Sequence, residues 1–231
     1  MSNERKSLIA STGLRQFMFL ASHGLRNPLT AIRWSCGRLE KVEEHSEEAR
    51  VYLEEIAKNT TRLTRILGAI FLLSHLQDQL QPLKYEHLVL HDMLKKSLPK
   101  EESDKSILID GDRTLALESD AEVLHSLFSC ILMGCIVAFN GYEPKPIRVQ
   151  LQGQSDTVSA TFLAEAPLQL LRTTPPEKLH TWQGANQLVG GTTGLLLTLS
   201  RDLAIAMGGY LKLQEGDHSF TVSVTLPKTR S

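Results

Sequence analysis

The chain is short of the residues that mark several common classes of protein. Of its 231 residues only 3 are cysteine and 6% are aromatic. The cysteines, Cys36, Cys130 and Cys135, are odd in number and lack the paired spacing of a zinc site. The sequence therefore predicts neither a disulfide framework nor a metal site, and it indicates a reducing compartment with small apolar packing roles for the three thiols.

An excess of one charge and long apolar runs are also missing. Lys plus Arg count 25 and Asp plus Glu count 26, so the formal net charge of −1 gives no electrostatic reason to bind nucleic acid. The first residues, MSNERKSLIASTG, lack the apolar core of a signal peptide, and no apolar run reaches the length that crosses a bilayer. We expect a cytoplasmic protein, or the cytoplasmic part of a longer one, with no membrane segment and no nucleic-acid partner.

What is present is the composition of an ordinary globular protein, with 42% hydrophobic and 22% charged residues. The length allows two small domains. The segment from Gln77 to Tyr85 places Pro82 among polar residues and marks a boundary. The prediction is one domain over 8–78 and a second over 86–228.

The most informative stretch is FMFLASHGLRNPLTAI, residues 17–32. Its apolar residues recur at three- and four-residue steps, which predicts a helix with His23 at its surface. Asn27 lies four residues later and therefore shares the helical face of His23. Pro28 removes a helical hydrogen bond and predicts a bend beside the imidazole. This geometry suits a histidine that carries a phosphoryl group.

Residues 17–32 resemble the phosphoacceptor box of the two-component sensor histidine kinases, whose usual form is F-x-x-x-x-S-H-E-L-R-T-P-L-T-x-I. The resemblance implies that His23 is phosphorylated, that Asn27 orients water for hydrolysis of the partner's phosphoryl group, and that Arg26 helps to hold the transferred group. Gly24 stands where the family has an acid that accepts the proton of the histidine, and glycine cannot act as a base. The box therefore favours phosphate acceptance, transfer or removal over self-phosphorylation.

The first domain is predicted to be a helical hairpin. Its first helix covers 8–43 with a bend at Pro28, and Ser46 caps the second, with Glu47 and Glu48 at the positive end of the helix dipole. The second helix carries apolar series at seven-residue spacing, which form a seam against other helices: Ile56, Leu63, Ile70, with Leu53, Thr60, Leu67 and Ser74 beside them. A second copy would complete a four-helix bundle, so a homodimer is expected, which the resemblance also implies. Met18, Phe71 and Leu72 are predicted to be core residues.

The second domain alternates helix and strand patterns. The predicted strands are 88–90, 107–110, 147–152, 158–163, 210–214 and 219–225, with a further short apolar piece over 114–117. The predicted helices are 91–98, 120–139 and 195–207, with Asp120 as a cap and Gly208-Gly209 as a stop. This order resembles the ATP-binding domain of histidine kinases, most clearly over Gly190 to Pro227. The fold class is therefore predicted to be α+β, a helical hairpin followed by an α/β sandwich of the histidine-kinase ATPase type.

The nucleotide-handling positions of this domain depart from the family pattern. The second glycine box falls on 192–197 and keeps Gly194 with Gly191 before it, as a vestigial nucleotide contact. The first glycine box places Ala164 at the adenine-binding aspartate, with Glu165 one residue away if the register slips. The remaining departures are Ala166 and Leu168 for glycines, and Cys130 and Gly134 for two asparagines, the second of which holds magnesium in the family. Arg172, Lys178 and His180 occupy the lid segment 170–189.

The combined prediction is a dimeric signalling protein of the histidine kinase family with a degenerate ATP-binding domain, a pseudokinase. It exchanges a phosphoryl group between His23 and an aspartate of a response-regulator receiver domain, which brings its own magnesium. No cofactor or metal is assigned to the chain. Two alternatives stay open: an active ATP-dependent histidine autokinase with an atypical nucleotide site, which needs ATP and magnesium, and a non-enzymatic interaction module.

Overall fold

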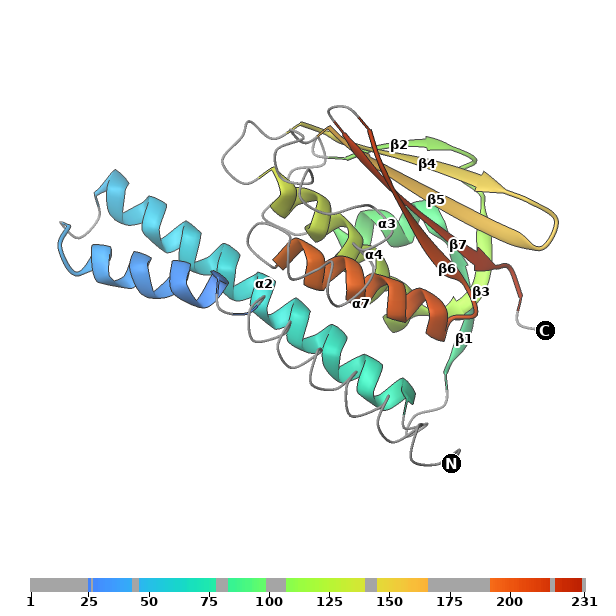
Figure 1. The fold of residues 1–231 in the computed structure, drawn as a ribbon, viewed down its shortest axis with the longest axis horizontal. Helices are drawn as coiled ribbons and strands as arrows, with labels where there is room; N and C mark the ends of the chain where they lie inside the picture. The colour runs from blue at the N-terminus through green and yellow to red at the C-terminus, as the bar shows by residue number, and fades with distance from the viewer. Residues whose placement is uncertain are drawn as a thin grey trace, which may run out of the picture.

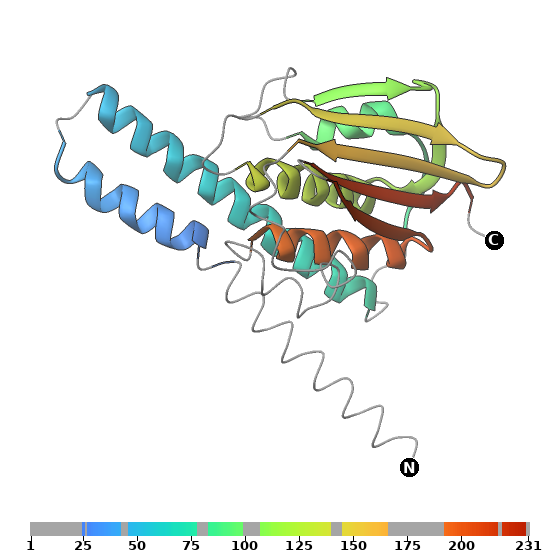
Figure 2. The same ribbon diagram turned by 45° about the horizontal axis from the view of Figure 1, so that its top comes forward.

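The computed structural model describes residues 25, 27–42, 46–77, 83–98, 107–139, 145–165, 192–216 and 219–229. They form a helical hairpin beside a domain in which helices cover a sheet (Figure 1). The loop end of the hairpin projects away from the sheet domain, whereas the rest of its second helix runs along that domain, as the two views agree (Figure 2). This is the predicted α+β class.

The hairpin joins a first helix, described over 27–39 with Leu25 also helical, to α2 (Glu47–Gln77). Ser46 caps α2 as predicted, because its Oγ accepts a hydrogen bond from Ala49 N at 3.0 Å. Arg38 of the first helix donates from Nε to the Tyr52 hydroxyl of α2 at 3.0 Å. Polar and cation–π contacts of Arg38 therefore tie the two helices together near their loop.

The second domain contains a small and a large sheet. Its elements are β1 (Tyr85–Val89), α3 (Leu90–Ser97), β2 (Ile107–Gly111), β3 (Ala116–Asp120), α4 (Ala121–Ala138), β4 (Ile147–Gly153), β5 (Thr157–Ala164), α7 (Thr192–Ala206), β6 (Tyr210–Glu215) and β7 (Phe220–Pro227). The large sheet has the order β2-β4-β5-β7-β6, parallel only between β2 and β4, and β1 pairs with β3 in the small one. The strand and helix predictions hold to within three residues, with shifts of three at the start of β1, predicted at Leu88, and at the start of α7, predicted at Leu195.

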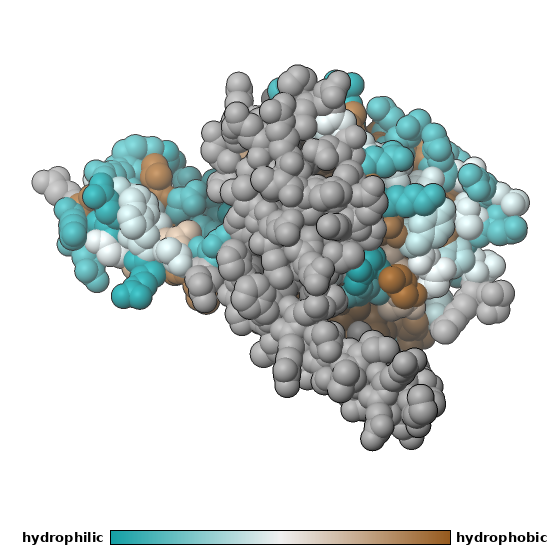
Figure 3. Space-filling view, viewed as in Figure 1, coloured by the Kyte–Doolittle hydropathy of each residue, from teal (hydrophilic) through white to brown (hydrophobic). Residues whose placement is uncertain are grey.

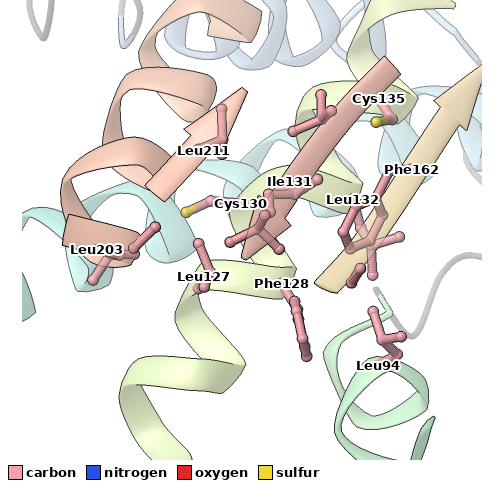
Figure 4. Packing of buried hydrophobic residues seen from close by; sticks show 14 of the residues in the cluster. Leu94, Leu127, Phe128, Cys130, Ile131, Leu132, Cys135, Phe162, Leu203 and Leu211 are labelled. Atoms are coloured by element: carbon pink, nitrogen blue, oxygen red, sulfur yellow. The ribbon is translucent and has the colours of Figure 1, made fainter. Parts of the chain in front are cut away.

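The core lies between the large sheet and α4 with α7. Every second residue of β5 is buried, and so is every second residue of β7, as expected for a sheet with one covered face. Figure 4 shows Phe162 of β5 near α4, and Leu203 of α7 beside Cys130. The outer surface is mainly hydrophilic where Figure 3 shows described residues.

Helix α4 is the most apolar element of the domain. Among the described residues it alone has the length and composition to cross a membrane, so the expectation of no such apolar run is wrong. Most of α4 is nevertheless buried inside the fold, as in the core helix of a globular protein. Asp120 caps it as predicted, accepting hydrogen bonds from Glu122 N at 2.9 Å and Val123 N at 3.2 Å.

Two side chains differ from their predicted burial. Phe71 was predicted to be core but is 64% exposed, while its neighbour Leu72 is buried as predicted. Cys36 is exposed on the first helix, whereas Cys130 and Cys135 are buried. Met18, the start of the first helix and the boundary residues 78–82 lie outside the described residues. The division into 8–78 and 86–228 stays a prediction.

We predict that Asp120→Ala lowers the free energy of unfolding by about 1 to 2 kcal/mol, because it removes the side-chain cap of α4. The same carboxylate also accepts from Lys84 N at 2.8 Å, which anchors the start of β1. Chemical denaturation followed by circular dichroism measures the change. Asp110→Ala, at an exposed aspartate of β2, is the control and should change stability by less than about 0.5 kcal/mol. Equal effects of the two substitutions would contradict the capping role.

Candidate functional site

The phosphoacceptor segment is only partly described. His23, Gly24 and Arg26 lie outside the described residues, so the structure does not place them relative to Asn27. Asn27 is on the first helix with an exposed side chain, and Pro28 beside it is buried. The amide that the sequence assigns to this site is therefore presented at the surface of the hairpin.

The two positions on α4 that the resemblance aligns with the family's asparagines are buried in apolar surroundings. Cys130 is 2% exposed, and burial raises the pKa of its thiol to about 12, with the charge of Arg65 acting in the opposite direction. A Cβ placed on Gly134 would lie 3.5 Å from Leu197 Cδ2 and 3.6 Å from Leu196 Cβ of α7. Neither position presents the oxygen ligand that magnesium prefers.

The end of β5 carries the residues that the resemblance assigns to the first glycine box. Ala164 is fully buried and lies on the same face of β5 as Phe162, toward the helices. Glu165 forms ion pairs instead, with Lys145 Nζ at 3.2 Å and Arg148 Nη2 at 3.6 Å. In the register that the sequence predicts, an alanine therefore occupies the inward position where the resemblance puts the adenine-binding aspartate.

The second glycine box is helical rather than a loop. Helix α7 begins at Thr192 and contains Gly194, whose carbonyl accepts a hydrogen bond from Thr198 Oγ1 at 2.8 Å. Both Thr192 and Gly194 are buried. Gly191 and the lid segment 170–189 lie outside the described residues. At Gly194 the conformation is that of a packed helix start, not of an open loop around a phosphate.

Within the described part of the chain, no cluster of three or more His, Cys, Asp or Glu side chains is arranged to hold a metal ion. What the structure does bring together is a polar network between α2, α3 and α4. Arg65 donates to Ser97 O at 3.1 Å and to Ser129 Oγ, and the Ser97 hydroxyl lies 3.1 Å from His125 Nδ1. Burial, and then the charge of Arg65, lower the pKa of His125.

Sequence reasoning missed this network. The one available signal was a charged residue, Arg65, directly before Ile66 at the start of a buried apolar series on α2. Its partners are two serines far apart in the sequence, and serines at such distances give no pattern that predicts contact.

Comparisons with known proteins show which domains and folds this chain is similar to. The model of the His Kinase A (phospho-acceptor) domain matches residues 14–79. Acinetobacter baumannii histidine kinase AdeS has a similar fold, with 16% identity, a TM-score of 0.58, and coverage of 89% of this chain and 98% of that one. Residues 14–79 therefore match a histidine kinase phosphoacceptor domain, and the similarities together support the two-component sensor histidine kinase family.

Two further similarities show how much of each related protein this chain covers. It is 22% identical over 233 residues to the swarming motility regulation sensor protein RssA of Serratia marcescens, covering 93% of this chain and 47% of the relative. The chain thus spans about half the length of that relative. It also resembles the histidine kinase ThkA in a crystal structure of ThkA with response regulator protein TrrA, at 20% identity and a TM-score of 0.59, over 98% of this chain and 64% of that one.

The packing of Gly134 against α7 leads to a prediction about the position that the resemblance aligns with a magnesium-holding asparagine. Gly134→Ala should be tolerated, with a stability change from zero to a gain of about 1 kcal/mol, because the new methyl group meets only ordinary van der Waals contacts and alanine favours helix. Gly134→Asn, which restores the family residue, should destabilise by about 2 kcal/mol or more, because it forces an amide between leucines. Thermal unfolding of both variants tests this. An asparagine variant as stable as the alanine variant would show that this face has room for a polar ligand.

Proposed function

We propose that this histidine kinase family member exchanges a phosphoryl group between His23 and an aspartate of a response-regulator receiver domain, and that it does not phosphorylate itself from ATP. The observation that carries the proposal is the contrast between its two halves. The phosphoacceptor box keeps His23 and Asn27 at helical spacing, whereas the nucleotide positions on α4 and β5 are filled by buried small residues.

The transfer needs little from this chain beyond the box. An imidazole nitrogen of His23 attacks the phosphorus of an aspartyl phosphate, a P–N bond forms and the P–O bond to the aspartate breaks, and the reverse step returns the group. The positive charge of Arg26 favours the phosphoryl oxygens near the helix. Asn27, one turn beyond His23, orients a water molecule when the partner is dephosphorylated. Magnesium is supplied by the receiver.

Self-phosphorylation lacks support at each step. Gly24 replaces the acid that would take the proton of the histidine. Cys130 and Gly134 supply no magnesium ligand, and Ala164 supplies no carboxylate for adenine. Each change removes a different part of nucleotide chemistry, and together they support a pseudokinase, with neither ATP nor magnesium as a resident cofactor.

The hairpin also supports a receiver domain as the partner and a homodimer as the assembly. The response regulator bound to the related ThkA supports a receiver domain that docks on the hairpin beside His23. On α2, Leu53, Leu67 and Phe71 are large exposed apolar residues, whereas Ile56, Leu63 and Ile70 are half-buried. An exposed apolar stripe on a hairpin helix supports a homodimer that completes a four-helix bundle. We place the protein in the cytoplasm, where receiver domains are available.

The central prediction concerns His23→Ala. Incubation with a phosphorylated receiver domain should transfer label to or from the wild type, and the variant should lose this exchange to background, because no other residue of the box offers an imidazole. Incubation with radiolabelled ATP and magnesium should leave the wild type unlabelled. His91→Ala, on α3 outside the hairpin, is the matched control and should exchange label normally.

Two results would overturn this function. Label taken from ATP by the wild type and not by His23→Ala would establish an autokinase with an atypical site. Exchange that is equal in wild type and His23→Ala, or absent from both with every cognate receiver, would leave an interaction module.

The homodimer gives a separate prediction. Leu67→Glu, at a residue that is 54% exposed on the stripe, should weaken dimerisation at least tenfold, because it buries a charge in the bundle. Sedimentation equilibrium measures the dissociation constant. Val51→Glu is the control, since the 100° step of a helix puts Val51 on roughly the opposite side of α2. A monomeric wild type, or equal weakening by both changes, would refute the stripe as the dimer surface.

A further inference from the structure

The second half of α2 is built into the second domain. Ile66, Ala69, Leu72 and Leu73 of α2 are buried in the same apolar cluster as the core of α4, α7 and the sheet. Both ribbon views show this half of α2 running along α4 and α7 (Figures 1 and 2). Because these residues are apolar, they alone would favour burial without fixing one orientation of the helix.

Arg65, a cation, lies beside this apolar face. The Arg65 guanidinium donates to Ser97 O, the carbonyl of the last residue of α3, at 3.1 Å, and it also contacts Ser129 Oγ of α4. A helix end carries unpaired carbonyls and partial negative charge, so this is a favourable place for a cation. The Ser97 hydroxyl donates in turn to Met93 O at 2.7 Å and lies 3.1 Å from His125 Nδ1 of α4.

We propose that Arg65 is a latch that locks α2 of the hairpin onto α3 and α4 of the second domain in one orientation, and that its release lets α2 open from α4 at Ser129, next to Cys130 in the chain. The latch goes beyond phosphoryl transfer and does not depend on it. It is a conformational device of this chain, formed by one arginine, two serines and a histidine.

The chemistry suits a latch better than a permanent joint. Hydrogen bonds to the half-buried charge of Arg65 fix geometry, because they are satisfied only in one arrangement of the partners. In the open arrangement the guanidinium, both serines and the histidine are all solvated, so opening leaves no buried polar group unpaired. An interface of leucines alone would lack this reversibility.

The latched face and the exposed stripe lie on different sides of α2. Counting 100° per residue, Leu67 and Phe71 lie roughly half a turn around the helix from Ala69 and Leu73. One side of α2 therefore remains available to a second copy of the chain while the other holds the second domain. The latch does not compete with the proposed dimer.

The native cysteines report on the latch. Cys130 follows Ser129 directly and its thiol experiences the charge of Arg65, whereas Cys135 is buried with no such influence. Cys36 is exposed and serves as the internal standard. The experiment is alkylation of the folded full chain by iodoacetamide at pH 8, with the rate at each cysteine read by peptide mass spectrometry.

In the wild type, Cys36 should react at once and both buried cysteines slowly. Arg65→Met should speed alkylation of Cys130 roughly 10- to 100-fold, the range expected when hydrogen bonds to a charged group are lost, and leave Cys135 unchanged. Loss of the nearby positive charge would by itself slow a thiol, so acceleration reports opening. Ser129→Ala, a milder variant, should speed Cys130 less, and Arg62→Met, whose guanidinium bonds to Asn59 on α2 itself at 3.3 Å, should not speed it.

Two outcomes would overturn the latch. An unchanged Cys130 rate in both Arg65→Met and Ser129→Ala would show that the apolar contacts alone hold α2 in place. Equal acceleration of Cys130 and Cys135 would show that Arg65 stabilises the domain as a whole. Neither outcome affects the phosphotransfer proposal, because the readout involves no phosphate.

Discussion

The burial of α4 is the constraint on which the rest of this structure depends. The helix is apolar around most of its circumference, and most of it is buried by the sheet, by α3 and α7, and by α2 of the hairpin. A helix covered in this way has little place for a polar side chain without a partner. This explains why Cys130 and Gly134 fit at positions where the family resemblance leads one to expect asparagines, and why the few polar groups on its surface, such as Ser129 and His125, are tied to neighbouring elements.

Because α4 must be covered, the hairpin also has a structural role in the second domain. In a chain made of two independent domains, α2 would need only one apolar face, for the first helix and a second copy. In this chain α2 carries a second apolar face. Its residues Ile66 and Ala69 cover a surface that α4 and α7 would otherwise leave exposed. The side chain that gives this second contact a direction is Arg65, at the edge of the face. The hairpin is thus both the phosphoacceptor element and a structural layer of the domain behind it.

The sequence predicted most of the fold and less of the site. Period-two burial in β4, β5 and β7 and the caps at Ser46 and Asp120 are local patterns, and the structure confirms them. Phe71 was assigned to the core because it is large and apolar, but it lies on the exposed side of α2; only the helical phase relative to the second domain distinguishes it from Leu72. The network of Arg65, Ser97 and Ser129 joins residues 32 and 64 positions apart, and no local pattern predicts such pairs.

The packing also offers a physical reason for a domain that keeps its fold while its nucleotide positions change. A loop that only binds ATP is free to diverge when ATP is no longer used, because nothing else rests on it. Helices α4 and α7 are different, because they cover the apolar face of α2, and losing them would expose Ile66, Ala69 and Leu73 to water. Selection on the phosphoacceptor hairpin would therefore retain the sheet domain as its support. Under the proposed loss of ATP chemistry, small residues such as Gly134 and Ala164 are what close packing favours at these positions.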